Sequence, residues 1–202
     1  ALAWTHTIHG EVLSETDAEG ETTTHTYDGL GRRIRTIAPA PLAYESTVTH
    51  DASGNVIAQT DGRGHTTTWT VDGLNRRLTQ TDTPIDGDTY TQAWIYDAAN
   101  NPITHTDRRG IETRIRFDGE NRERSRTRDG VLRATRSFDA SGNLITQTDA
   151  LGHVTTHTWN GANELTRTDR PDGVSETWTY FPWGDIASET DADGITTRYT
   201  DD

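Results

Sequence analysis

Polar and apolar residues alternate along this chain in short runs of six to eight residues, and brief Asp- and Gly-containing stretches separate the runs. Residues 64–82 show the pattern, because Thr alternates with Trp69 and Val71 before an Asp-Gly stretch and a second run. Alternation with a period of two is typical of half-buried strands, and turn residues between such runs predict β-hairpins. No segment has an apolar period near 3.6, so we expect no helix longer than one turn.

The hairpin pattern repeats along the whole chain with a basic period of 21 residues. The step is 23 residues from Asp28 to Asp51 and 25 residues from Asp72 to Asp97. We therefore expect residues 1–202 to be a single array of about nine and a half units, with roughly 19 strands in an all-β antiparallel meander. The residues that define the repeat are Tyr27, Asp28, Gly31, Asp51, Gly54, Asp72, Tyr96, Asp97, Phe117, Asp118, Phe138, Asp139, Gly142, Trp159 and Tyr180.

The odd period predicts two different turns in each unit. Side chains would change face at every repeat unless one loop has an even and the other an odd number of residues. We expect a two-residue loop after the aromatic position, as in residues 72–75. We expect a three-residue loop between units, as in residues 61–64, with its Gly in the left-handed region and a bulge.

This register predicts two chemically distinct faces of the sheet. Trp69, Val71 and Leu78 fall on one face, and Thr68 and Thr70 fall on the other. Because open sheets of many strands twist and curl, we expect the array to form an open spiral or shell-like sheet.

The composition narrows the class of protein. Cys is absent, which excludes disulfides, thiolate metal sites and Cys nucleophiles. The 19 basic residues are all Arg and the net charge is −13, which argues against nucleic acid and anionic membranes as partners. Apolar runs are too short for membrane insertion. The missing Met at position 1 indicates a piece of a longer chain, and 38 Thr favour strands over disorder.

The residues that could carry chemistry are better explained by turns and strands. Asp191 and Asp193 resemble the opening of a calcium loop, but the further ligands of an EF-hand are missing. His153 and His157 would lie about 13 Å apart on one strand face, too far to hold one metal ion. No Gly-x-Ser-x-Gly elbow is present. We therefore expect no enzyme activity, no cofactor and no metal site.

One segment differs in charge from the rest of the chain. Residues 108–136 contain ten Arg and five acidic residues, a net charge of +5, which leaves −18 for the remainder. By the register, Arg122, Arg124 and Arg126 lie on the aromatic face, and Arg114 and Arg116 replace the Thr pair on the other face. Two interpretations remain open: Arg side chains bridged to neighbouring acids, or a patch for an acidic cargo, an anionic glycan or a neighbouring shell segment.

The stretch Tyr27-Asp28-Gly29-Leu30-Gly31-Arg32 resembles the YD repeat of Rhs proteins. The same repeat builds the B and C components of insecticidal toxin complexes and the barrel of teneurins. Residues 138–144 and 180–185 match the same pattern. The resemblance implies a secreted or cell-surface bacterial protein whose repeats form a hollow β-shell around a toxin or effector polypeptide. The implied partners are neighbouring repeats and that enclosed polypeptide.

Two further expectations remain. A different class of protein also fits, namely a cell-surface adhesin whose repeats bind carbohydrate through Trp and Tyr. Aromatic exposure separates the two classes, because glycan binding needs open rings. The first and last strands would present unpaired backbone groups, so we also expect edge-to-edge self-association.

Overall fold

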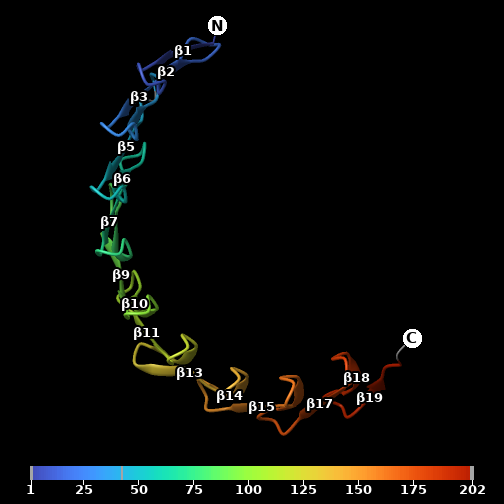
Figure 1. Ribbon diagram of the computed structural model, residues 1–202. Coiled ribbons are helices and arrows are strands. Elements are labelled where there is room, and N and C mark those ends of the chain that lie inside the picture. The colour runs from blue at the N-terminus through green and yellow to red at the C-terminus, as the bar shows by residue number, and fades with distance from the viewer. Residues whose placement is uncertain (1, 42, 201–202) are drawn as a thin grey trace. The chain divides into compact units, whose positions relative to one another are not determined.

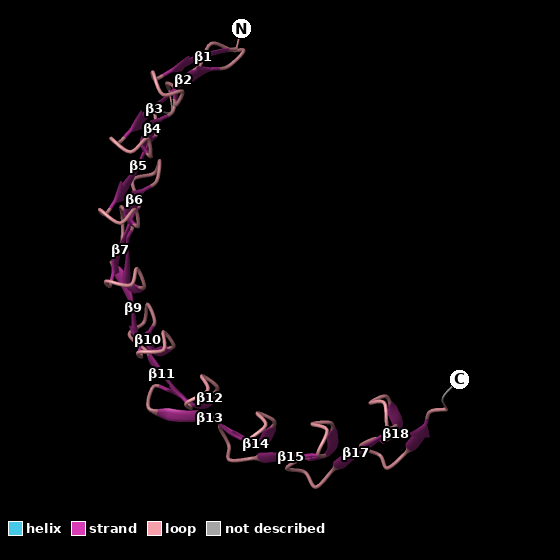
Figure 2. Cartoon of the chain, viewed as in Figure 1, coloured by secondary structure: helices cyan, strands magenta, loops and turns pink. Residues whose placement is uncertain are grey.

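The computed structural model describes residues 2–41 and 43–200, and all regular structure in them is β-strand (Figures 1 and 2). Because these residues form no helix, they contain none that is long and apolar enough to cross a membrane. The expectation of an all-β chain is confirmed.

The chain forms two compact units, one made of Ala1–Ile95 with His105–Gly110 and the other of Tyr96–Thr104 with Ile111–Asp202. The strands of the first unit are β1 (Ala3–His6), β2 (Val12–Thr16), β3 (Thr22–Tyr27), β4 (Arg33–Ile37), β5 (Glu45–His50), β6 (Val56–Thr60), β7 (Thr66–Val71), β8 (Arg77–Thr83) and nearly all of β9 (Tyr90–Tyr96).

The second unit continues the same succession of hairpins. Its strands are β11 (Glu112–Phe117), β12 (Glu123–Arg128), β13 (Val131–Phe138), β14 (Leu144–Asp149), β15 (Val154–Trp159), β16 (Leu165–Asp169), β17 (Ser175–Tyr180), β18 (Ile186–Thr190) and β19 (Thr196–Arg198). The strand β10 (Pro102–Thr106) contributes residues to both units.

Each strand of the first unit pairs antiparallel with the next strand in sequence, and the same holds from β11 to β19. All 19 strands belong to one sheet. The predicted antiparallel meander of hairpins is therefore confirmed, and the strand number matches the repeat count.

The turns differ from the expected pair of loops. After the aromatic position, the Gly31 N–H donates to the Asp28 carbonyl at 3.0 Å; between units, the Gly64 N–H donates to the Asp61 carbonyl at 2.9 Å. Gly31 and Gly64 have φ values of 73° and 84°, in the left-handed region that glycine adopts without strain. Both turns thus have the same three-residue loop, and the prediction of a two-residue loop after the aromatic position is wrong.

With two equal loops, a 21-residue repeat needs one extra residue to keep each side chain on its face, and a β-bulge at the aromatic position supplies it. Thr70 pairs with Thr79, but Val71 pairs with Arg77, so Arg77 and Leu78 together oppose Val71. The same register shift occurs before the aromatic position in all the hairpins of this type whose pairing is described. Because a bulge inserts one extra residue into one strand, it lets a 21-residue repeat keep every side chain on its face.

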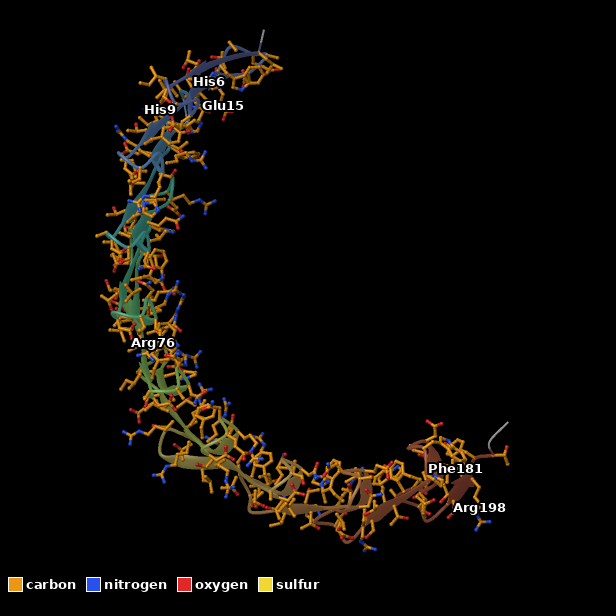
Figure 3. All side chains as sticks on the ribbon, viewed as in Figure 1. His6, His9, Glu15, Arg76, Phe181 and Arg198 are labelled. Atoms are coloured by element: carbon orange, nitrogen blue, oxygen red, sulfur yellow. The ribbon has the colours of Figure 1, made fainter. Side chains whose placement is uncertain are left out.

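The two faces have the predicted chemistry. On one face, which we call the aromatic face, the Trp69 indole N–H donates to the Gln80 side chain at 3.2 Å. On the other, the hydroxyl face, the Thr70 and Thr79 hydroxyl oxygens are 2.7 Å apart. Figure 3 shows side chains standing on both sides of the ribbon.

The sheet has no apolar core in the part of the chain that the structure describes. The buried residues there are both polar, His25 at 8% and Thr168 at 7% exposure. A sheet that is one layer thick has no second layer to cover its faces. Its stability therefore rests on the backbone ladder and on cross-strand side-chain pairs, which contribute roughly 0.2–1 kcal/mol each.

Candidate functional site

The recurring aspartates shape the turns through hydrogen bonds to the backbone. Asp28 Oδ1 accepts the N–H groups of Leu30 and Arg32, and Asp28 Oδ2 accepts the Arg32 Nε–H at 2.7 Å. The backbone N–H of Arg32, together with its guanidinium, holds the pKa of Asp28 below its usual value against the effect of burial. The same Oδ1 contact to the N–H four residues later occurs at Asp51, Asp72, Asp97, Asp118 and Asp139. These aspartates therefore stabilise the turns.

The turns also contact each other from one repeat to the next. The Asn55 side chain donates to the Asn75 side chain at 2.7 Å, and Asn143 donates to Asn163 at 2.9 Å. Where the second position is glycine, the first carries a longer side chain: a Cβ built on Gly142 would lie 3.3 Å from Arg122 Nη1. Gly31, Gly54 and Gly184 face Glu11, Arg32 and Glu164 in the same way.

The residues of the aromatic position lie over the preceding hairpin. The Tyr27 hydroxyl donates to the Val12 carbonyl at 2.8 Å, and the Tyr180 hydroxyl donates to the Leu165 carbonyl at 2.7 Å. The Trp159 indole makes the equivalent contact. Tyr96, Phe117 and Phe138 occupy the same position and are half-buried. These rings are therefore engaged by the sheet itself.

The histidines occupy strand and turn positions. His25 and His157, two residues before the aromatic position, each place Nδ1 3.0 Å from a Thr hydroxyl on the facing strand. His65 and His153 lie beside the turn residues Asp61 and Asp149. Over residues 2–41 and 43–200, no group of three or more His, Cys, Asp or Glu is placed to hold a metal ion.

Two places on the surface depart from the repeat. In the turn after β17, Phe181 replaces the aspartate and stacks on Trp183 with ring centroids 4.8 Å apart, and Trp183 is 55% exposed. In the first unit, a hollow of about 450 Å³ lies beside Trp69 and Asp82. There Asp82 accepts hydrogen bonds from Thr67 and Gln80 and pairs with Arg108 at 2.8 Å, so its polar groups already have partners.

The structure separates the five arginines of the candidate anionic patch. Arg122 lies between Asp118 and Glu120, with its guanidinium 4.6 Å from the centroid of the Phe138 ring. On the aromatic face, Arg126 pairs with Glu123 at 2.6 Å, and Arg124 is exposed. These three arginines do not share a surface with Arg114 and Arg116.

Arg114 and Arg116 lie on the hydroxyl face of β11 beside a hollow of about 610 Å³. Arg116 is opposite Ser125 and Arg114 is opposite Thr127. The hollow is lined by Glu112, Arg114, Arg116, Ser125, Thr127, Gly130, Leu132 and Thr135.

A different turn builds this hollow. Asp129 and Gly130, between β12 and β13, have φ values of 53° and 71°, the pattern of a two-residue hairpin turn. Arg128 pairs directly with Val131, so both strands extend to the turn. The sequence carries a signal for this turn, since Asp-Gly replaces the usual Asp-x-x-Gly. The hydroxyls of Ser125, Thr127 and Thr135 were not predicted as part of this site, because only strand pairing brings them beside the arginines. The Asn–Asn and Arg–Gly turn contacts were also missed, although the residues recur about 20 positions apart.

Comparisons with known proteins agree with the repeat. The family model "RHS Repeat" matches residues 9–40 and 138–175. A search of the curated proteins found no match.

Among solved structures, the chain is similar to TcdB2-TccC3-TEV, with a TM-score of 0.57 and 17% identity over 93% of this chain and 11% of that one. It is similar to TcdB2-TccC3 with a TM-score of 0.58 and 16% identity over 93% and 11%. It also matches the Photorhabdus luminescens Tc holotoxin pore, with a TM-score of 0.47 and 15% identity over 93% and 12%.

The chain thus spans about a tenth of the length of the chains that it matches. The first two similarities show that the fold is shared with TcdB2-TccC3 over nearly all of this chain. Two segments match the repeat family by sequence, and they lie in the first and second units, respectively. The chain therefore carries RHS repeats by sequence in these two segments and shares the fold of TcdB2-TccC3 over most of its length.

Proposed function

We propose that this chain is a non-enzymatic structural segment of a bacterial RHS-repeat β-shell that encloses a secreted toxin or effector polypeptide. Its 202 residues would form one repeat array curling into an open spiral, with neighbouring repeats of the same shell as its first partners. The single observation that carries the proposal is the one-layer meander of 19 strands, in which no apolar residue of the described chain is buried. Such a sheet is a wall with two accessible faces.

The chemistry of the hydroxyl face supports the role of a wall around a polypeptide. Thr hydroxyls pair across the strands, as at Thr60 and Thr66 and at Thr81 and Thr91. Large exposed apolar patches mark surfaces that bind other proteins or aggregate. This face instead presents paired hydroxyls between charged side chains. A polypeptide can therefore lie beside these paired hydroxyls without adhering to them. Secretion or display at the bacterial surface follows from the same proposal.

The alternative, a carbohydrate-binding adhesin, is less well supported. Sugar stacking needs aromatic rings that are open on an accessible face. At the aromatic position, Tyr27, Trp159 and Tyr180 instead donate hydrogen bonds to the preceding hairpin. The exposed rings of Trp4 and Trp183 lie outside that position. A glycan array tests this class directly, and saturable binding to a defined glycan would favour the adhesin.

Cryo-electron microscopy and limited proteolysis of the complete gene product that contains these residues test the proposal. We expect a hollow particle with the repeats in its wall, and an internal polypeptide that proteases cleave only after the particle is denatured. A gene product without a hollow, or a polypeptide cleaved equally fast before and after denaturation, contradicts the proposal.

A further inference from the structure

The hollow on the hydroxyl face of β11–β13 contains a cation that lacks a partner. Arg116 is exposed and has no hydrogen bond or ion pair within the described residues. The one acidic residue of the lining, Glu112, already accepts the Arg114 Nε–H. The hollow therefore keeps a net positive charge.

The groups around Arg116 suit a carboxylate. A guanidinium offers parallel N–H donors that match the two oxygens of a carboxylate. Ser125 lies directly opposite Arg116 and pairs on its other side with Thr135, so hydroxyl donors flank the guanidinium. Leu132, opposite Thr127, adds an apolar contact.

The spacing of the arginines matches an extended peptide. Arg114 and Arg116 are two residues apart on one face of a strand, which places their Cα atoms about 6.8 Å apart. An extended peptide repeats its side chains on one face at the same interval. Glu at alternate positions of such a peptide would therefore face both guanidinium groups.

We propose that this hollow binds an extended acidic polypeptide segment, with Arg116 and Arg114 taking alternate carboxylates. The proposal rests on the proposed function for the source of the segment, the enclosed polypeptide, but the binding step needs no shell. The positive charge of the hollow favours an acidic partner. The lining holds no aromatic ring on which a base could stack, which disfavours single-stranded nucleic acid.

Fluorescence polarisation with labelled peptides and the full 202-residue chain tests the proposal. The probe is a twelve-residue peptide of alternating Glu and Thr, and its control is an isomer of the same composition with Glu in adjacent pairs. The chain's net charge of −13 repels acidic peptides in general, so saturable binding reports a local site. We expect the alternating peptide to bind more tightly than its isomer, and binding to weaken at high salt.

The matched variants are Arg116→Gln and Arg124→Gln, two exposed arginines on opposite faces of the same strand pair. We expect Arg116→Gln to weaken binding about fivefold, the upper range for one exposed ion pair, and Arg124→Gln to leave it unchanged. Equal effects of the two variants, absence of saturable binding, or tighter binding of inorganic phosphate or an oligothymidine than of the peptide would overturn the proposal.

The two proposals fail separately. If the gene product encloses a polypeptide but the acidic peptide does not bind, the inference about this hollow is wrong and the shell proposal stands. If the peptide binds through Arg116 but no hollow particle forms, the shell proposal is wrong and the hollow remains a polypeptide-binding site.

Discussion

Hairpins β7–β8 and β11–β12 occupy the same position in the repeat, but their faces carry different chemistry. Both have an Asp–Arg pair in the turn, Asp72 with Arg76 and Asp118 with Arg122, and both have a bulge before the aromatic position. On the hydroxyl face, however, the position of Thr70 is taken by Arg116.

The difference shows which positions of the repeat are constrained. Because no apolar side chain of the described residues is buried, a strand position does not need a particular shape or polarity to fill a core. The turn and the bulge must be kept, since they determine which face each side chain occupies. Strand positions can then change from Thr to Arg while the register is preserved, and charge can be introduced locally.

Deleting Leu78 should have the largest effect on the fold. The deletion removes the extra residue of the bulge, so the side chains of the remaining hairpins would move to the opposite faces. We expect the cooperative unfolding transition, monitored by circular dichroism, to be lost. As a control, removal of Ile85 and Asp86 from the loop between β8 and β9 is an even change and should retain the transition.

Acid should destabilise both hairpins together. The Arg76 side chain holds the pKa of Asp72 below its ordinary value, and the backbone N–H of Arg122 does the same for Asp118. A carboxylate with a lowered pKa in the folded state stabilises the fold above its ordinary pKa, and that contribution is lost as the pH falls through the lowered value. Because the pKa of Asp169 is lowered to about 2, mainly by Arg167, the loss of stability should continue down to about pH 2.

Urea titrations between pH 7 and pH 2 measure this effect. We expect the midpoint to fall steadily below about pH 4, the ordinary range of Asp. Asp72→Asn and Asp118→Asn should each flatten the dependence, because Asn160 shows that an amide can accept the same turn hydrogen bonds. A midpoint that is independent of pH in this range would contradict the role of the turn aspartates.

On the aromatic face, Trp69 and Ile115 occupy equivalent positions and should differ in their contributions to the free energy of unfolding. Trp69 bonds to Gln80 and lies under Arg77, whose guanidinium carbon is 5.3 Å from the ring centroid. Because both residues are half-buried, Trp69→Ala should cost about 2 kcal/mol and Ile115→Ala about 1 kcal/mol, measured by urea denaturation. Equal costs would mean that the indole contacts contribute nothing beyond burial.

On the hydroxyl face, the expected differences are the smallest. Thr79→Ala removes the hydrogen bond to Thr70 and should cost about 0.5 kcal/mol. The equivalent Ser125 hydroxyl has no hydrogen-bond partner in the described part of the chain, so Ser125→Ala should be close to neutral. A larger loss for Ser125→Ala than for Thr79→Ala would show that the arginine-bearing hairpin depends on this hydroxyl for stability.

The comparison also separates local from non-local information in the sequence. The alternation around Trp69 and the 21-residue period were sufficient to predict strands, their number and their faces, because side chains of a strand must alternate. The turn signal Asp-x-x-Gly did not reveal the loop length, and two different loops were predicted where the same three-residue loop occurs both between units and after the aromatic position. The bulge at Val71 depends on pairing with the facing strand and has no local signal of its own.

The repeat, the two faces and the excess of arginine in residues 108–136 are therefore all predictable from the amino-acid sequence. Which arginines share a surface depends instead on how the strands pair. Arg122, Arg124 and Arg126 are close in sequence to Arg116 but lie at a turn or on the opposite face. Thr135, on the next strand, lines the same hollow as Arg116 because the pairing of β11, β12 and β13 brings it there. Because no single segment encodes the register across three strands, the sequence alone does not place these side chains together.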